Sequence, residues 1–290
     1  MKLSNRKDFL QASGVLLAMA IASSSFDYKK QMPLLSFSTL GCPDWTFHQI
    51  TDFAVDNNFK GIELRGIQRE LELTKCKEFS NAENILATSK LMAEKGLRFS
   101  DLGSSAAMHH SDGKERQKNL EEAKRFIDLA QKIQCPCIRV FPNNLPKDQE
   151  RNATIDLIIE GLIESHGELV HIADLQKIMQ SAEHKNVGMV WDIVNMWSAT
   201  KEPPAAVYAT LKKYIRHTHI KDLKIVDGKE QYTFLGTGET PIFEAIDILH
   251  KNGYKGYYSF EWEKLWHPEI EEPEKAFAHY SKVMREHFKA

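Results

Sequence analysis

From Leu34 onward the chain repeats one pattern of apolar and polar positions. An amphipathic helical segment is followed by a turn with Gly or Asn and a nearby Lys, and then by a short apolar strand that ends on a polar residue. Residues 57–64 and 251–261 are two clear examples. A repeat of this kind, at the length of a βα unit, is what a parallel sheet with crossover helices requires.

This rule predicts eight strands: Leu34–Leu40, Gly61–Arg65, Leu97–Leu102, Cys137–Phe141, Leu162–His166, Gly188–Asp192, Ile215–Lys221 and Gly256–Glu261. Helical spacing of apolar residues over Glu121–Gln134 and Pro241–Lys251 predicts helices that pack on the sheet. Eight parallel strands, each followed by a helix, close into a barrel, so the predicted fold is α/β, a (β/α)8 TIM barrel. No linker divides residues 31–290, and we expect them to form a single domain.

The most informative strand is Arg216–Asp222. Because side chains alternate along a strand, His217, His219 and Lys221 share one face. Two imidazoles and an ammonium on one face are poor core filling, since each must lose water without an obvious partner. They indicate a ligand, a metal or a carboxylate cluster. For either histidine alone, a hydrogen-bonded core position is the simpler alternative.

Acids end several other strands, and in a barrel these strand ends meet at one mouth. The mouth candidates are Glu63, Asp101, Glu164, His166, Asp192, His217, His219, Lys221, Glu261 and Glu263. Several carboxylates in one cavity repel each other unless a cation lies among them or they keep their protons. Oxygen ligands from Glu164, Asp192 and Glu261 with the imidazole of His219 would suit a divalent metal, whether Mn, Mg, Co or Zn.

Several motifs, taken in order, resemble the xylose-isomerase-like TIM-barrel superfamily of sugar isomerases and epimerases. They are residues 36–43, Gly61–Arg65, Ile163–Gly167, Trp191-Asp192, His217–Asp222 and Ser259–Glu263. The superfamily also includes inosose dehydratases and apurinic endonucleases. Each motif is weak alone, but their order and their position at strand ends cover nearly the whole chain after residue 30.

The resemblance implies a metal held by Glu164, Asp192, His219 and Glu261. It also implies that the two glutamates, Glu164 and Glu261, are the catalytic acid and base. The substrate-binding residues that it implies are His166, His217 and Lys221. We expect Glu63 to face inward as well, as support for the ligands or as a substrate contact.

One segment departs from the family pattern. The apolar run Ala153–Glu160 passes through Gly161 almost directly into Leu162–Glu164. A full helix, a turn and a strand are expected there, so we predict a barrel that is contracted around its fourth helix and fifth strand. A distorted barrel would misplace Glu164 and His166, whereas Asp192, His219 and Glu261 would still be able to hold a metal.

The N-terminus resembles a twin-arginine export signal. Asn5–Leu10 is followed by the apolar run Gly14–Ala22 and then by three serines. Lys7 stands where the second arginine is expected, which keeps both the folded-protein and the general export routes open. We therefore expect residues 1–30 to be an export signal and tether, and the mature protein to be periplasmic or otherwise exported. A membrane-surface or buried N-terminal helix is the alternative.

The overall charge excludes one function class. The chain has 38 basic and 40 acidic residues, for a net charge of −2, and no clustered basic excess of the kind that nucleic-acid binding needs. No second long apolar segment exists, so we expect no membrane association after signal removal. The expected partner is a small sugar.

The predicted function is a divalent-metal-dependent isomerase or epimerase that acts through an enediolate on a free sugar or sugar derivative. A lyase or dehydratase for a keto-sugar or inosose would use the same metal site. A catalytically silent carbohydrate-binding barrel is the third alternative, because of the contracted region before Glu164.

Overall fold

The computed structural model describes residues 32–110, 113–142, 163–164, 169–182 and 185–289. The predicted export signal, His166 and the helical run 153–160 lie outside the described residues. Residues Pro33–Phe288 form one compact unit. Within the described part of the chain, no helix combines the length and the apolar character needed to cross a membrane.

The described elements alternate between strand and helix. The barrel strands are β1 Leu34–Ser38, β2 Gly61–Leu64, β3 Arg98–Ala107, β4 Ile138–Phe141, β5 Ile163–Glu164, β6 Met189–Asp192, β7 Ile215–Ile220 and β10 Tyr257–Phe260. The α-helices are α2 Phe47–Asp56, α3 Ala82–Glu94, α4 Gly113–Ile133, α6 Ile172–Ser181, α7 Ile193–Thr200, α8 Pro204–Leu211, α9 Ile242–Lys251 and α10 Pro273–Lys289. Short 3-10 helices cover Thr39–Gly41, Leu73–Lys75 and Lys77–Phe79, and a hairpin joins β8 Leu223–Val226 to β9 Lys229–Tyr232.

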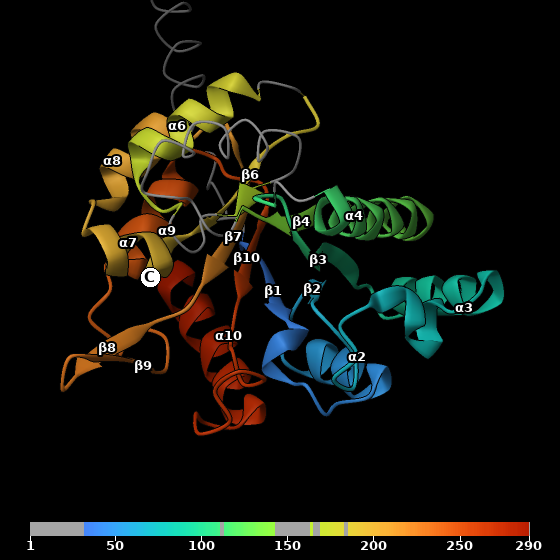
Figure 1. The fold of residues 1–290 in the computed structure, drawn as a ribbon. Helices are drawn as coiled ribbons and strands as arrows, with labels where there is room; N and C mark the ends of the chain where they lie inside the picture. The colour runs from blue at the N-terminus through green and yellow to red at the C-terminus, as the bar shows by residue number, and fades with distance from the viewer. Residues whose placement is uncertain (1–31, 111–112, 143–162, 165–168, 183–184, 290) are drawn as a thin grey trace, which may run out of the picture. The chain divides into compact units, whose positions relative to one another are not determined.

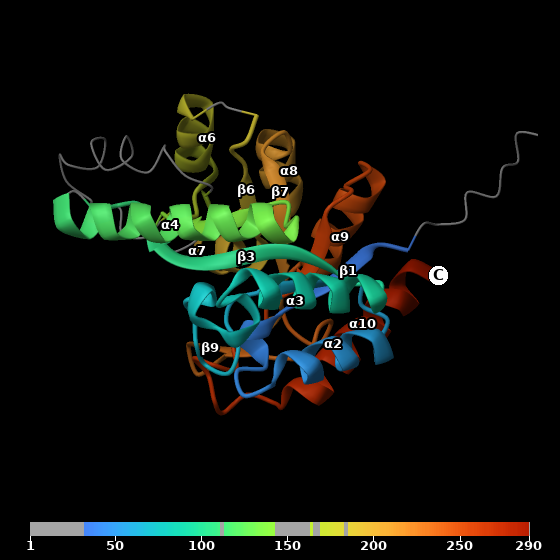
Figure 2. The same ribbon diagram turned by 90° about the vertical axis from the view of Figure 1, so that its right-hand side faces the viewer.

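The eight predicted strands are confirmed. They form a closed barrel in the order β1-β10-β7-β6-β5-β4-β3-β2, and every neighbouring pair is parallel. Helices lie outside the ring of strands, as Figures 1 and 2 show for α2, α3 and α4. The fifth strand, predicted over Leu162–His166, is described over Ile163–Glu164, and Ile163 pairs with Val140 on one side and Met189 on the other. The short strand therefore still closes the ring.

The third strand runs farther than predicted, to Ala107 instead of Leu102. Its Gly-Ser-Ser sequence is typical of a turn, but Arg139 holds it in the sheet. The Arg139 guanidinium donates from Nη1 to the Ser104 carbonyl at 2.7 Å, and Ser104 Oγ donates to the Arg139 carbonyl at 2.7 Å. At Gly103 an added Cβ would lie 2.9 Å from Arg139 Nη2, so the absence of a side chain allows this close approach.

The β8–β9 hairpin is the element that our sequence analysis missed. Its turn is Asp227-Gly228, with positive φ angles of 51° and 74°, the combination that two-residue hairpin turns favour. Because the hairpin directly follows β7, it places β9 near the carboxyl ends of the barrel strands. Figure 1 shows it projecting beside α10.

Aromatic rings join the last helix to the barrel. The Phe277 ring on α10 stacks on Phe37 of β1 at a centroid distance of 4.4 Å and meets Phe260 of β10 at 6.0 Å. Trp262, just after β10, is buried, and its Nε1 donates to the Glu271 carbonyl at 2.8 Å. The residues just beyond β10 are thus fixed from outside, which holds their inward-facing neighbours in place.

We predict that Phe277→Ala lowers the free energy of unfolding by about 3–5 kcal/mol, because it removes a fully buried ring from this contact. Leu86→Ala is the control, since Leu86 on α3 is 71% exposed, and it should change stability by less than about 0.5 kcal/mol. Urea unfolding measures both variants. Equal losses in the two variants would show that α10 is not anchored in this way.

Candidate active site

Glu63 of β2 is the hub of the barrel interior. Its Oε2 accepts hydrogen bonds from His217 Nε2 at 2.9 Å, His219 Nε2 at 3.2 Å and Ser259 Oγ at 2.7 Å. Burial alone would raise the pKa of Glu63, but the two imidazoles beside it hold that pKa well below its ordinary value. An ionised Glu63 therefore orients both histidines of β7 from behind.

His219 joins this interior to the mouth. While Nε2 faces Glu63, Nδ1 lies 3.2 Å from Glu261 Oε1 and 3.9 Å from Asp192 Oδ2. All three side chains are buried, and each comes from a different strand or strand end. An imidazole whose second nitrogen binds a carboxylate is the usual arrangement of a metal-ligating histidine.

Asp192 has its two oxygens in different environments. It ends β6 and caps α7, because Oδ1 accepts a hydrogen bond from the Asn195 backbone amide at 2.9 Å. Oδ2 lies on the side of His219 and 2.9 Å from Lys221 Nζ. The cap fixes the carboxylate plane, so the position of Oδ2 is set by the helix.

Lys221 lies within a cage of carboxylates. Its Nζ is 2.9 Å from Asp192 Oδ2, 2.7 Å from Glu261 Oε2 and 2.7 Å from Glu263 Oε1, and the side chain is fully buried. Burial would lower the pKa of the ammonium, but these three carboxylates raise it well above its ordinary value. An ammonium has three hydrogens, and the cage offers an acceptor for each. The predicted substrate-binding role of Lys221 stays a prediction, because the geometry favours orientation of the acids.

Glu261 is held as an anion by the same arrangement. Burial alone would raise its pKa, but His219 and Lys221 keep it well below the ordinary value. One oxygen of Glu261 faces His219 and the other faces Lys221. At neutral pH the Glu261 carboxylate is therefore ionised, and it faces His219 and Lys221 at the carboxyl ends of the barrel strands.

The outer part of the site includes a residue that the sequence analysis missed. Tyr232 of β9 donates from Oη to Glu263 Oε1 at 2.9 Å, the oxygen that also accepts from Lys221. His267 lies beside both, with its ring centroid 5.0 Å from that of Tyr232. The Asp227-Gly228 turn was the available signal, because it predicts a hairpin that returns to the mouth.

Asp222, the last residue of the β7 motif, has a structural task. Its Oδ2 accepts from the backbone amides of Gly236 and Gly238 at 2.9 Å each, and Oδ1 accepts from Thr240 Oγ1. The glycine-containing loop after the hairpin is thus folded around a carboxylate. Since that carboxylate takes the amides that a phosphate would need, this loop is no phosphate cradle.

The other predicted residues divide into two groups. Glu164 belongs to β5, where its backbone pairs with Val190, and its side chain is outside the described part. His166 is outside it as well. Asp101 is buried next to Glu63 in the strand register, and its electrostatic neighbours include His217. It belongs to the interior of the barrel rather than to its rim.

Within the described part of the chain, two sets of side chains have the spacing of metal ligands, namely Asp192 with His219 and Glu261, and Glu63 with His217 and His219. In the second set, Glu63 Oε2 already accepts three hydrogen bonds, two of them from the imidazoles themselves. In the first set, the oxygens of two buried anions face His219 Nδ1. The first set therefore fits a divalent metal, and three of the four predicted ligands come together there.

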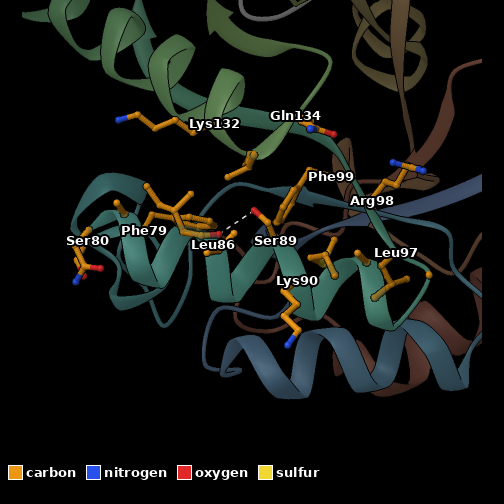
Figure 3. A pocket seen from close by; sticks show the side chains of 17 residues that line it. Phe79, Ser80, Leu86, Ser89, Lys90, Leu97, Arg98, Phe99, Lys132 and Gln134 are labelled. Atoms are coloured by element: carbon orange, nitrogen blue, oxygen red, sulfur yellow. Dashed lines mark hydrogen bonds between the residues drawn. The ribbon is translucent and has the colours of Figure 1, made fainter.

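A cavity of about 890 Å³ lies elsewhere, between α3 and α4. Leu86, Phe99 and Lys132 are among its lining residues (Figure 3). The described residues of its lining include no acid, histidine or cysteine, so we assign no chemistry to it.

We predict that Asp101→Asn changes how stability depends on pH. Burial raises the pKa of Asp101 from 3.8 to about 6, so ionisation of this carboxyl opposes folding. The cost is absent below the unfolded pKa and complete above pH 6, where a shift of this size is worth about 3 kcal/mol. Relative to the parent, the variant should gain about that much stability between pH 4 and pH 8, measured by urea unfolding. A constant difference across this range would contradict the assignment.

We further predict that Lys221→Met destabilises the metal-free protein by about 3–5 kcal/mol, because three carboxylates lose their shared cation. Added Mn²⁺ should then stabilise the variant more than the parent, since the metal restores a positive charge. Urea unfolding with chelator and with Mn²⁺ gives both values, and Lys282→Met on the exposed face of α10 is the control. A similar metal increment in parent and variant would show that Lys221 does not balance these acids.

Known proteins resemble this chain in sequence and in fold. A 3-dehydroshikimate dehydratase from Bacillus anthracis is 22% identical over 227 residues, which span 69% of this chain and 78% of the dehydratase. The crystal structure of the probable 3-DHS dehydratase AsbF, from the same organism, matches with a TM-score of 0.70 and 17% identity, over 87% of this chain and 98% of that one.

Other solved structures share the fold at similarly low sequence identity. An L-ribulose 3-epimerase matches with a TM-score of 0.68 and 13% identity, over 89% of this chain and 95% of that one. A xylose isomerase-like TIM barrel protein from Mycobacterium smegmatis, solved in complex with magnesium, matches with a TM-score of 0.64 and 15% identity, over 90% and 97%. The family described as xylose isomerase-like TIM barrel matches residues 51–166 and 161–287. With the closed parallel barrel and the acids and imidazoles at its strand ends, the chain belongs to the xylose isomerase-like TIM barrel family.

Proposed function

We propose that this chain is a divalent-metal-dependent enzyme that isomerises or epimerises a free sugar or sugar derivative. The observation that carries the proposal is the convergence of Asp192, Glu261 and His219 Nδ1 at the strand ends. A metal bound there would supply Lewis-acid stabilisation of negative charge on a substrate carbonyl oxygen. The resemblance to epimerases in fold supports the same class of chemistry.

Glu261 is the proposed base. His219 and Lys221 keep its pKa low, so Glu261 is ionised and has a lone pair that would accept a proton from the carbon beside a carbonyl. Removal of that proton gives an enediolate, and return of a proton to the other face or to the neighbouring carbon gives the epimer or the isomer. Glu164 is the proposed second acid and base. His217 and Glu63 hold the imidazole of His219, and His166 is proposed to contact the substrate.

The residues around the mouth of the barrel favour a substrate without a phosphate group. Lys221 is engaged by three carboxylates, so it offers no unpaired charge for a phosphate group. The loop after the hairpin is occupied by Asp222. A substrate without phosphate also agrees with the proposed export of the protein.

A lyase or dehydratase is the second candidate, favoured by the 3-dehydroshikimate dehydratase relative. It would begin with the same proton abstraction by Glu261. The enediolate would then expel an oxygen substituent one carbon farther on, instead of taking the proton back. The two candidates therefore differ in product and share the base.

The test is proton exchange in deuterated water. The purified protein is incubated with Mn²⁺ and a panel of ketoses, keto-glycosides and inososes, and the products are followed by NMR. Deuterium beside the carbonyl together with an epimer or an aldose supports the isomerase. Loss of water or of a glycosyl group supports the lyase, and absence of exchange on every candidate leaves a sugar-binding barrel.

We predict that Glu261→Gln lowers the rate of deuterium incorporation by about 100-fold or more, which is the usual effect of removing a catalytic base. Glu286→Gln is the matched control, because this glutamate is exposed on α10 and makes only a long ion pair with Lys282. The control should keep the parental rate. Equal rates in Glu261→Gln and the parent would remove Glu261 from the chemistry.

A further inference from the structure

A second cavity, of about 430 Å³, opens at the end of the barrel opposite the proposed active site. Its lining comes from strand beginnings: Gly256 and Tyr257 at the start of β10, Cys137 just before β4 and Ser100 near the start of β3. Asp192 and Glu261, by contrast, stand at strand ends. The two sites therefore occupy different ends of the strands.

Cations from three separate segments line this cavity. Lys185 precedes β6, Arg216 is the second residue of β7, and Lys255 precedes β10. Among the described residues that line the cavity there is no carboxylate. The lysine that recurs before the strands in the sequence pattern thus contributes, through Lys255, a positive charge at the amino end of the barrel.

The position of the Arg216 side chain depends on a glycine in the neighbouring strand segment. A Cβ added to Gly188 would lie 2.2 Å from Arg216 Cγ, so this glycine lets the arginine side chain lie across the start of β6. The guanidinium is also anchored, since Nη1 donates to the Lys213 carbonyl at 2.8 Å. Arg216 is therefore anchored beside the cavity, while its side chain stays exposed to solvent.

The cavity also has buried polar groups. Ser100 is 1% exposed and its Oγ has no hydrogen-bond partner among the described residues. His217 is 2% exposed, and its Nε2 is held by Glu63. The acids nearest to His217 are Glu63 and Asp101, and neither lines the cavity.

We propose that this cavity binds a small oxyanion, of the class of phosphate, sulfate or a short dicarboxylate. Arg216, Lys185 and Lys255 would neutralise its charge, and the Ser100 hydroxyl would donate to it. A buried hydroxyl without a partner loses free energy, and an oxyanion supplies the acceptor. Guanidinium and ammonium groups around one pocket are the usual means of holding such an anion. The three cations lie at the opposite ends of the strands from Asp192 and Glu261, so the proposal does not depend on the chemistry of the active site.

The test is titration of inorganic phosphate into the whole chain with Mg²⁺ present, followed by ³¹P line broadening and calorimetry. The double variant Arg216→Gln/Lys255→Gln should weaken phosphate binding by about tenfold or more, because two charge-assisted contacts are lost. Ser100→Ala should weaken it less, without the risk of altering the surface charge. Circular dichroism checks that each variant folds.

Two controls make the result specific. Lys118→Gln/Lys282→Gln removes the same charge from exposed positions on α4 and α10, and should leave binding unchanged. Asp192→Asn alters the other end of the barrel and should also leave it unchanged. Competition by sulfate and by malonate then shows which oxyanion the cavity prefers. Absence of phosphate binding, equal weakening by the charge control, or loss of binding in Asp192→Asn alone would overturn the proposal.

Discussion

The barrel interior depends on the pairing of buried carboxylates with side chains of β7 and with Lys221, the residue that follows this strand. Glu63 is matched by His217 and His219, and Glu261 by His219 and Lys221. Unpaired charges in so dry a place would cost several kcal/mol each, whereas paired and hydrogen-bonded ones are tolerated. Because side chains alternate along β7, His217, His219 and Lys221 follow one another on the same face, and their carboxylate partners follow in the same order from the barrel interior to the mouth.

This order also explains how the site is kept rigid. The carboxylates of Asp192 and Glu63 are fixed by backbone or hydroxyl donors, Asp192 by the start of α7 and Glu63 by Ser259. Glu263 is fixed by Tyr232 from the hairpin. Each acid thus has one oxygen committed to the scaffold or to a neighbouring side chain. Preorganised groups of this kind are what proton transfer beside a carbonyl requires.

Much of the fold followed from local patterns in the sequence. The eight strands could be predicted because each contains a short apolar run closed by a polar residue, and the shared face of His217, His219 and Lys221 followed from the period of a strand. The partners of Lys221 could not be predicted, since they depend on distances between β6, β7 and the segment after β10. The extension of β3 was missed because Arg139, far away in sequence, holds a stretch that looks like a turn. The roles of Glu164 and His166 remain predictions.

The central claim is that Asp192, Glu261 and the imidazole of His219, at the strand ends, bind one divalent ion. Anomalous diffraction from crystals grown with Mn²⁺ tests it most directly. The account predicts a single strong peak within coordination distance of His219 Nδ1, Asp192 and Glu261. A peak among Glu63, His217 and His219 Nε2, or no peak in the barrel at all, would contradict it.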